Sequence, residues 1–208
     1  QAMDALSSQA NVAGYAAVML AAVESPKYPS MLVTAAGTIP PARSLVLGVG
    51  VAGLQAIATF RRLGAIVHAY DIRPETKEQV ESLGAKFVEA PTQEMDEGGY
   101  AKEVDADTAA KQQEVLAEFV AKSDLVVTTA QIPGKPAPRL VNADVVASMR
   151  PGSVIVDMAA SSGGNVEGSR PGEEVEINGV KILGPIDLPS RVATDASRMY
   201  ARNLQELV

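Results

Sequence analysis

The stretch LVLGVGVAGLQAIATFRRLGAIVHAYD, residues 45–71, decides the fold. An apolar run leads into three glycines spaced as G-x-G-x-x-G, which are Gly48, Gly50 and Gly53. A helical pattern follows them, and a second apolar run ends at Asp71, 18 residues beyond Gly53. The glycine spacing alone is a weak signal. A strand before it and an acidic residue after the next strand are typical of a dinucleotide-binding unit.

Each glycine in this turn has a distinct physical task. Gly48 permits the tight turn, Gly50 lets the main chain approach a pyrophosphate at the helix N-terminus, and Gly53 lets helix and strand pack closely. Asp71 can accept both ribose hydroxyls of an adenosine, and its charge would repel a 2′-phosphate. Arg73 lies two residues further on and could counter that charge. We therefore predict an NAD(H) site; the alternative is a tight turn that holds no ligand.

Short apolar runs with little polar alternation recur along the chain, as is typical of strands buried on both faces. They cover residues 45–49, 66–70, 86–88, 125–130, 154–158 and 180–183. Helical patterns separate them, at residues 52–63, 75–83, 108–122 and 143–149, the last with Asn142 as its predicted N-cap. Because strand and helix alternate with short connections, we predict an α/β fold, a Rossmann-type doubly wound parallel sheet flanked by helices.

Two longer helices are predicted outside this alternation, at residues 2–22 and 190–207. They serve either as extra cover for the core or as links to a neighbouring domain. The apolar run near the start, residues 12–23, is shorter than a membrane span and follows no basic region. We therefore predict neither a membrane helix nor a signal peptide. Segments rich in Pro and Gly are predicted loops, at residues 34–43, 98–99, 132–138 and 161–172.

The composition narrows the function further. The 208 residues carry a net charge of -7, whereas a surface that follows nucleic-acid phosphates needs clustered Lys and Arg in excess. The chain has no cysteine, which excludes disulfides and thiolate nucleophiles. With a single histidine and no cysteine, a zinc centre is not expected, and we predict no metal site.

No general acid or base stands out beside the predicted cofactor, although most dehydrogenases need one there. His68 lies inside the second predicted strand, where a structural role is expected. Lys135 lies in the proline-rich segment QIPGKPAPRL, and we assign it no role. Either the acid and base lie outside this chain or the reaction needs none. Direct hydride exchange between two nicotinamides is a reaction of the second kind.

Eight segments spread over the whole chain carry a family resemblance. They are QAMDALSSQANVAGY (1–15), TAAGTIPPAR (34–43), GVGVAGLQAIAT (48–59), KEQVESLGAKF (77–87), GGYAKE (98–103), IPGKPAP (132–138), PGSVIVDMA (151–159) and PSRVATDAS (189–197). Together they resemble the NAD(H)-binding domain I of the alpha subunit of proton-translocating NAD(P) transhydrogenase, in the alanine dehydrogenase/pyridine nucleotide transhydrogenase family. The resemblance implies the nucleotide-binding subdomain of domain I. Its connecting helix would cover about residues 1–30, its Rossmann core 31–189 and its return helix 190–208, with the preceding subdomain outside this chain.

The resemblance also implies an enzymatic activity and partners. Domain I passes hydride from its NADH to NADP+ held by domain III of the beta subunit, and a membrane domain couples this transfer to proton translocation. A homodimer of domain I is implied, with no direct membrane insertion of this chain and no nucleic-acid partner. The implied location is the cytoplasmic side of the inner membrane in a bacterium, or the matrix side in a mitochondrion.

Residue roles follow from the same resemblance. Gln1, Asp4 and Ser7 match positions that orient the nicotinamide without acting as acid or base. The family's loop at this point also holds an arginine, which would precede Gln1. Positions that match cofactor contacts are the pyrophosphate turn Gly48, Val49, Gly50, Val51, Ala52 and Gly53, the ribose-binding Asp71, Ile72 and Arg73, the mobile-loop residues Gly99 and Tyr100, and Gln112, Ala130 and Gln131.

Two other functions stay open. Alanine dehydrogenase resembles this family in the PGSVIVD and IPGKPAP regions, and its catalytic Lys and His would lie in a preceding domain. The segment QAMDALSS and Asp187 in GPIDLPSRV favour the transhydrogenase instead. A non-catalytic module that binds NAD for regulation would also do without acid and base groups.

Overall fold

The computed structural model of the chain describes residues 2–91, 106–132 and 134–206, with side chains left out at 106–109. Its centre is a sheet with the strand order β5-β4-β3-β6-β7-β9-β8. The strands are β3 (Arg43–Leu47), β4 (Ile66–Tyr70), β5 (Lys86–Phe87), β6 (Leu125–Thr128), β7 (Val154–Asp157), β8 (Glu174–Ile177) and β9 (Val180–Leu183). All neighbouring pairs are parallel except β8 with β9. The predicted doubly wound fold is confirmed, with one antiparallel edge strand that was not predicted.

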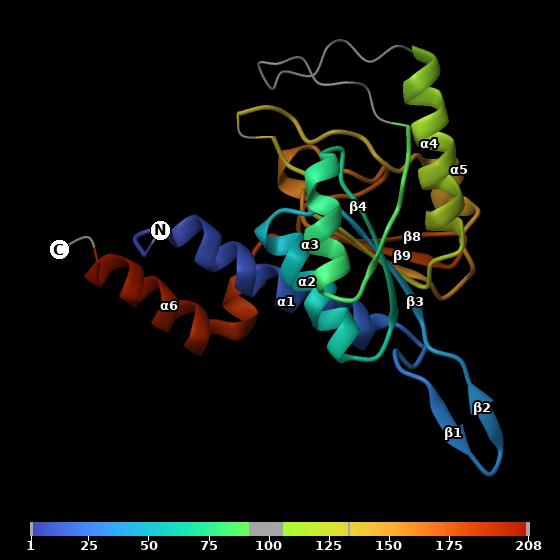
Figure 1. The fold of residues 1–208 in the computed structure, drawn as a ribbon, viewed down its shortest axis with the longest axis horizontal. Helices are drawn as coiled ribbons and strands as arrows, with labels where there is room; N and C mark the ends of the chain where they lie inside the picture. The colour runs from blue at the N-terminus through green and yellow to red at the C-terminus, as the bar shows by residue number, and fades with distance from the viewer. Residues whose placement is uncertain (1, 92–105, 133, 207–208) are drawn as a thin grey trace.

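Helices cover both faces of this sheet (Figure 1). They are α1 (Ala5–Glu24), α2 (Val51–Arg62), α3 (Lys77–Ser82), α4 (Ala106–Ala121), α5 (Ala143–Ala147) and α6 (Ala193–Gln205), with short 3-10 helices η1 (Pro74–Thr76), η2 (Ala160–Ser162) and η3 (Leu188–Val192). Two buried clusters result. Val46 of β3 packs with the side chains of α1, α2 and α3, whereas its neighbour Leu45 packs with those of α4 and α5. Burial of both strand faces explains why the strands read as continuous apolar runs.

Helix α1 lies directly across the first turn of α2. A Cβ on Gly14 would be 2.2 Å from the carbonyl oxygen of Ala52, so only glycine permits this approach. The helix begins at Ala5, three residues later than predicted at residue 2, because Asp4 caps it. By length and composition alone its 20 residues are apolar enough to cross a membrane. Its buried residues, such as Ala17 and Val18, pack in the core instead, as in the core helix of a globular domain.

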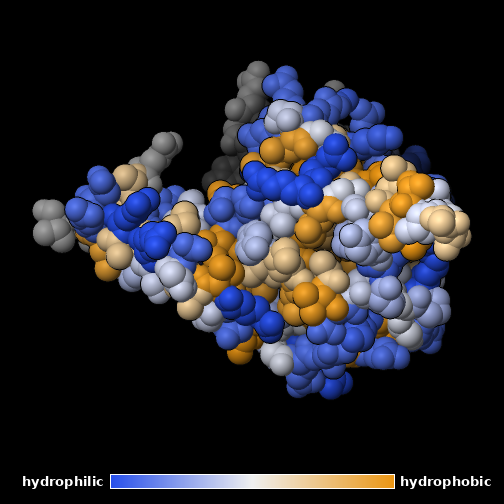
Figure 2. Space-filling model, turned by 90° about the horizontal axis from the view of Figure 1, so that it is seen from below, coloured by the Kyte–Doolittle hydropathy of each residue, from blue (hydrophilic) through white to orange (hydrophobic). Residues whose placement is uncertain are grey.

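A small hairpin projects from the body at the lower right of Figure 1. Strands β1 (Leu32–Thr34) and β2 (Gly37–Ile39) pair with each other and not with the central sheet. The prediction of a loop over residues 34–43 was therefore wrong in its first half. Met31, Val33 and Ile39 on this hairpin are exposed. Figure 2 views the molecule from the side to which the hairpin points, and hydrophobic residues interrupt the hydrophilic surface there.

The order of the parallel strands fixes where a ligand can bind. From β3 the chain winds one way through β4 to β5 and then the other way through β6, β7 and β9. The two directions meet between β3 and β6, where Leu47 pairs with Thr128 at the carboxyl ends of both strands. In open α/β sheets, ligands bind outside the carboxyl ends at such a switch point.

Candidate functional site

The glycine turn lies at this switch point. Gly48 follows β3 with φ of +99°, a conformation that favours glycine. A Cβ on Gly53 would lie 1.9 Å from the Gly48 carbonyl oxygen, so the start of α2 presses against the end of β3. A Cβ on Gly50, in contrast, would meet nothing within 4 Å. Gly50 thus leaves open space at the turn, and Gly48 and Gly53 are fixed by packing.

The first turn of α2 is suited to an anion. Gly50 is its N-cap, and neither a side-chain cap nor an acidic residue occupies the first turn. The N–H groups of Val51 and Ala52 belong to this end of the 12-residue helix, where the backbone dipole favours negative charge. The open space beside Gly50 and the uncapped helix end fit the pyrophosphate of a dinucleotide.

Asp71 follows β4 and is almost completely buried, with 8% of its surface exposed. Its Oδ2 accepts a hydrogen bond of 2.7 Å from the Val49 N–H, which ties the carboxylate to the glycine turn. Its Oδ1 accepts the backbone N–H of Arg73 at 2.9 Å, and both oxygens accept the Arg73 guanidinium. Burial alone would raise the pKa of Asp71, but the hydrogen bonds from Arg73 and Val49 hold it below its usual value. The group is a fixed carboxylate beside the turn. Ile72 next to it is half exposed.

The loop after β6 forms the other side of the switch point. Thr129 Oγ1 donates to the Gly48 carbonyl at 2.9 Å, and Gln131 Nε2 donates to the Met158 carbonyl at 3.1 Å. Asn165 Nδ2 donates to the carbonyl of Ala130 at 2.9 Å. Ala130 and Gln131, which the resemblance predicts as cofactor contacts, thus belong to the loop that borders the glycine turn.

Three supporting residues were not predicted from the sequence, namely Thr129, Asp157 and Asn165. Asp157 is fully buried at the end of β7, where it accepts hydrogen bonds from Thr128 Oγ1, the Ala159 N–H and the Val166 N–H. An acidic residue that ends an apolar run at the carboxyl edge was the available signal for Asp157. Asn165 has no such signal, because it lies in a Gly-rich loop.

Asp4 and Ser7 meet at the start of α1. Asp4 is the N-cap, and its carboxylate accepts the Ser7 N–H at 2.9 Å and the Ser7 hydroxyl at 2.6 Å. These hydrogen bonds lower the pKa of Asp4, so it is a carboxylate at neutral pH. Both residues lie at the end of α1 that extends beyond α2, since Gly14 marks the crossing. Gln1, the third residue of this predicted group, lies outside the described residues.

A cleft of about 400 Å³ separates the N-terminal half of α1 from the carboxyl edge of the sheet. Its lining comprises Leu6, Gln9, Ala10, Ala13, Ala52, Thr129, Gln131, Met158, Pro185, Ile186, Leu188 and Pro189. Ala52 and Gln131 connect it to the glycine turn. Among the described residues that line the cleft, none is ionisable. The cleft suits a flat, neutral or weakly polar ring.

Gln112 Nε2 donates a hydrogen bond to the hydroxyl of Tyr70, the last residue of β4. This contact attaches helix α4 to the end of the strand that leads to Asp71. Tyr70 is buried, and burial together with the neighbouring Asp71 raises its pKa to about 12, so its hydroxyl stays protonated. Gly99 and Tyr100 lie outside the described residues.

His68 lies in the middle of β4, and its ring is 5.3 Å from that of Phe119. Burial, with Lys86 and Arg43 nearby, lowers its pKa. The folded protein therefore binds this proton less well than the unfolded chain, and stability should fall as pH drops below about 6.5. We expect His68→Gln to flatten the change in urea midpoint between pH 7 and pH 5 and to leave NADH affinity unchanged. A loss of NADH affinity at pH 7 would contradict a structural role.

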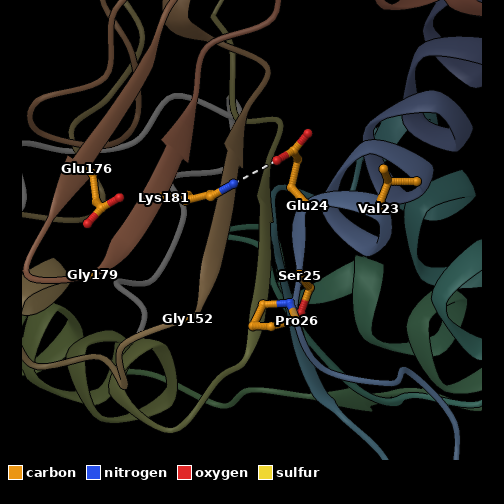
Figure 3. A pocket seen from close by; sticks show the side chains of 8 residues that line it. All are labelled: Val23, Glu24, Ser25, Pro26, Gly152, Glu176, Gly179 and Lys181. Carbon is orange, nitrogen blue, oxygen red and sulfur yellow. Dashed lines mark hydrogen bonds and ion pairs between the residues drawn. The ribbon is translucent and has the colours of Figure 1, made fainter.

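A second cleft, of about 390 Å³, lies at the opposite, amino edge of the sheet (Figure 3). Gly152 and Gly179, which precede β7 and β9, line it together with the end of α1. Lys181 Nζ lies 2.8 Å from Glu24 Oε2 and thereby joins β9 to α1. None of the predicted site residues that the structure describes lines this cleft.

Comparisons with known proteins agree with this architecture. The family described as "Alanine dehydrogenase/PNT, C-terminal domain" matches residues 17–208. The chain is 50% identical to NAD(P) transhydrogenase subunit alpha of Haemophilus influenzae over 100% of its own length and 41% of that protein. The crystal structure of transhydrogenase from Sinorhizobium meliloti superposes with a TM-score of 0.88 at 52% identity, over 98% of this chain and 55% of that one. An L-alanine dehydrogenase structure gives 0.76 at 27% identity, over 96% and 52%. The chain thus spans about half the length of these relatives.

Proposed function

We propose that this chain, which belongs to the alanine dehydrogenase/PNT C-terminal domain family, is the NAD(H)-binding part of a transhydrogenase. It binds NAD(H) at the glycine turn and exchanges hydride directly with an NADP(H) held by a partner subunit. The adenosine ribose would meet Asp71, the pyrophosphate would meet the uncapped start of α2, and the nicotinamide would lie in the cleft beside α1.

The observation that carries this proposal is the chemistry of the cleft. Its described lining offers no acid or base, so an alcohol or amine dehydrogenase would have to take its proton-accepting group from the preceding domain. Hydride exchange between two nicotinamides moves no proton at the reacting carbons. It requires only that the two rings be held about 3–3.5 Å apart and aligned. Such a reaction needs a cleft that positions the ring and neither donates a proton to the substrate nor accepts one from it.

Asp4 does not line the cleft, but it caps the helix whose Leu6 does, and it is proposed to orient the nicotinamide rather than to accept a proton. Its carboxylate is held by Ser7, which fixes the direction of its remaining lone pairs. We expect Asp4→Asn to slow hydride transfer about tenfold or more, because misplacement of about 1 Å costs up to a hundredfold in rate. NADH affinity should stay nearly unchanged. Stopped-flow transfer to the NADP-binding partner, in the full-length subunit, measures this. A large loss of NADH affinity with normal turnover would contradict the assignment.

The proposed function is tested first by calorimetric titration with NADH and NADPH. We expect binding of NADH and much weaker binding of NADPH, because Asp71 would accept the 2′-hydroxyl of the ribose, and a 2′-phosphate replaces that donor. The full-length subunit is then mixed with NADH, an NAD analogue and the NADP-binding domain. Separately, pyruvate and ammonia are supplied with NADH. Hydride exchange without pyruvate reduction supports the proposal. Pyruvate reduction selects an alanine dehydrogenase, and binding without either reaction selects a regulatory module.

The partners follow from the same proposal. The NADP-binding domain would approach the open side of the cleft, and a membrane domain of the complex would carry the protons. The chain would lie at the cytoplasmic or matrix face of that membrane as a peripheral component. The exposed apolar hairpin of β1 and β2 supports a homodimer, because side chains such as Val33 are otherwise left in water. The connecting and return helices, α1 and α6, pack on each other and would lead into the preceding subdomain.

A further inference from the structure

The hydrogen bonds of Asp71 fill its whole acceptor capacity. A carboxylate offers about four lone-pair positions, two on each oxygen. Oδ1 accepts the Arg73 backbone N–H at 2.9 Å and Arg73 Nε at 3.0 Å. Oδ2 accepts the Val49 N–H at 2.7 Å and Arg73 Nη2 at 3.1 Å. A ribose that brings two hydroxyl donors to this carboxylate therefore has to displace two of the present ones.

The four donors differ in how easily they can leave. The N–H groups of Val49 and Arg73 belong to the main chain of the glycine turn and of the segment after β4, so they stay in place. The Arg73 side chain is 46% exposed and can rotate into solvent. Its guanidinium presents two parallel N–H donors to the two carboxylate oxygens, as the neighbouring 2′- and 3′-hydroxyls of a ribose would. Arg73 Nη2 also donates to the Val49 carbonyl at 3.3 Å, which closes the guanidinium over the turn.

We propose that the Arg73 guanidinium competes with the ribose diol for the two outer acceptor positions of Asp71, so that nucleotide binds by exchange with this side chain. The inference rests on the proposed NAD(H) site and adds a built-in competitor that sets its affinity. When only a fraction of the protein has Arg73 turned away, the apparent dissociation constant rises by the inverse of that fraction. Removal of the side chain should therefore tighten binding, which is the opposite of what a residue that only contacts the nucleotide would show.

The test uses Arg73→Met and Arg73→Lys with NADH, in the full-length subunit. Arg73→Met keeps much of the aliphatic stem and removes the donors, and we expect the Kd for NADH to fall about three- to tenfold. Arg73→Lys keeps the charge but supplies a point donor in place of the fork, so we expect a smaller fall. If Arg73→Met does not fold, the Kd of Arg73→Lys for NADH still tests the proposal. Association rates, measured by stopped-flow fluorescence, should rise in the same order.

ADP and 2′,3′-dideoxy-ADP provide the matched control. ADP carries the diol and should bind more tightly to Arg73→Met than to the wild type. The dideoxy nucleotide has no hydroxyl to donate to Asp71, so its Kd should be the same for both proteins. Two results would contradict the proposed competition and leave the NAD(H) site intact. In the first, NADH binds the wild type but binds Arg73→Met more weakly. In the second, the affinities for ADP and for its dideoxy form rise equally in Arg73→Met. If NADH does not bind the wild type, the proposed function itself fails.

Discussion

Replacement of Gly53 by alanine is expected to lower the free energy of unfolding by about 3 kcal/mol, at the upper end of the range for overpacked sites. The added methyl group would lie 1.9 Å from the Gly48 carbonyl oxygen and 3.3 Å from Thr129 Oγ1. The first neighbour is main chain that ends β3, so relief requires α2 to move away from the sheet. Urea denaturation followed by circular dichroism measures the loss. NADH affinity should fall with it, because the turn opens as the helix shifts.

Gly50→Ala is the matched control for this prediction. Gly50 has φ of -84° and ψ of -167°, which alanine adopts without strain, and its Cβ would meet nothing within 4 Å. Stability should change by less than about 0.5 kcal/mol, as for exposed substitutions. The methyl group would nevertheless stand where a pyrophosphate approaches, and we expect NADH affinity to fall about tenfold, which is about 1.4 kcal/mol. Normal NADH binding by Gly50→Ala would contradict the pyrophosphate position, and a stable Gly53→Ala would contradict the packing argument.

The inner strands of the central sheet, such as β3, β6 and β7, could be predicted because they are buried on both faces. The strand at residues 66–70 and the one at 180–183 were predicted with their observed ends. Strand β8 was not predicted, although Asn178-Gly179 between it and β9 is a hairpin signal, and both residues have positive φ. Its pattern, Glu174-Val175-Glu176-Ile177, alternates as an edge strand should, whereas the predicted strands are continuous apolar runs. The hairpin of β1 and β2 contributes no side chain to the core, so its strands show no run of buried apolar residues by which they could be predicted.

The position of the site could be predicted, but its internal contacts could not. Spacing alone places Gly48 and Asp71 at the ends of adjacent strands, because parallel strands end at one edge of the sheet. The Arg73 rotamer that donates to Asp71 depends on the direction of the main chain after β4, and the spacing of residues in the sequence does not determine that direction. The capping of α1 by Asp4 shows the same limit. The helix was predicted to start earlier, and Asp4 was assigned to the nicotinamide without its bond to Ser7. Asn142, predicted as an N-cap, holds that position, but Glu167 supplies the side chain that accepts the Ala143 N–H.

Replacement of Asp157 by alanine is expected to cost about 3–5 kcal/mol of stability, because each buried donor left without an acceptor costs about 1–3 kcal/mol. Three donors depend on this carboxylate: Thr128 Oγ1 at 3.0 Å, the Ala159 N–H at 2.9 Å and the Val166 N–H at 3.1 Å. The cavity left by the side chain adds to the loss. Asp157→Asn retains one oxygen acceptor, but its amide group must face one of the N–H donors, so we expect an intermediate loss. Chemical denaturation of both variants gives the order.

The effect of Asp157 should extend to the cofactor, and this separates it from an ordinary core residue. The loop it holds supplies the Met158 carbonyl to Gln131 and places Asn165, which donates to the Ala130 carbonyl. Under conditions where Asp157→Asn is still folded, we expect NADH affinity to be reduced, since the wall of the cleft loses its support. Asp195→Ala is the control, because Asp195 is exposed and its ion pair with Arg198 is a surface contact worth little. An Asp157→Asn protein that binds NADH as the wild type does would show that this wall takes no part in holding the nucleotide.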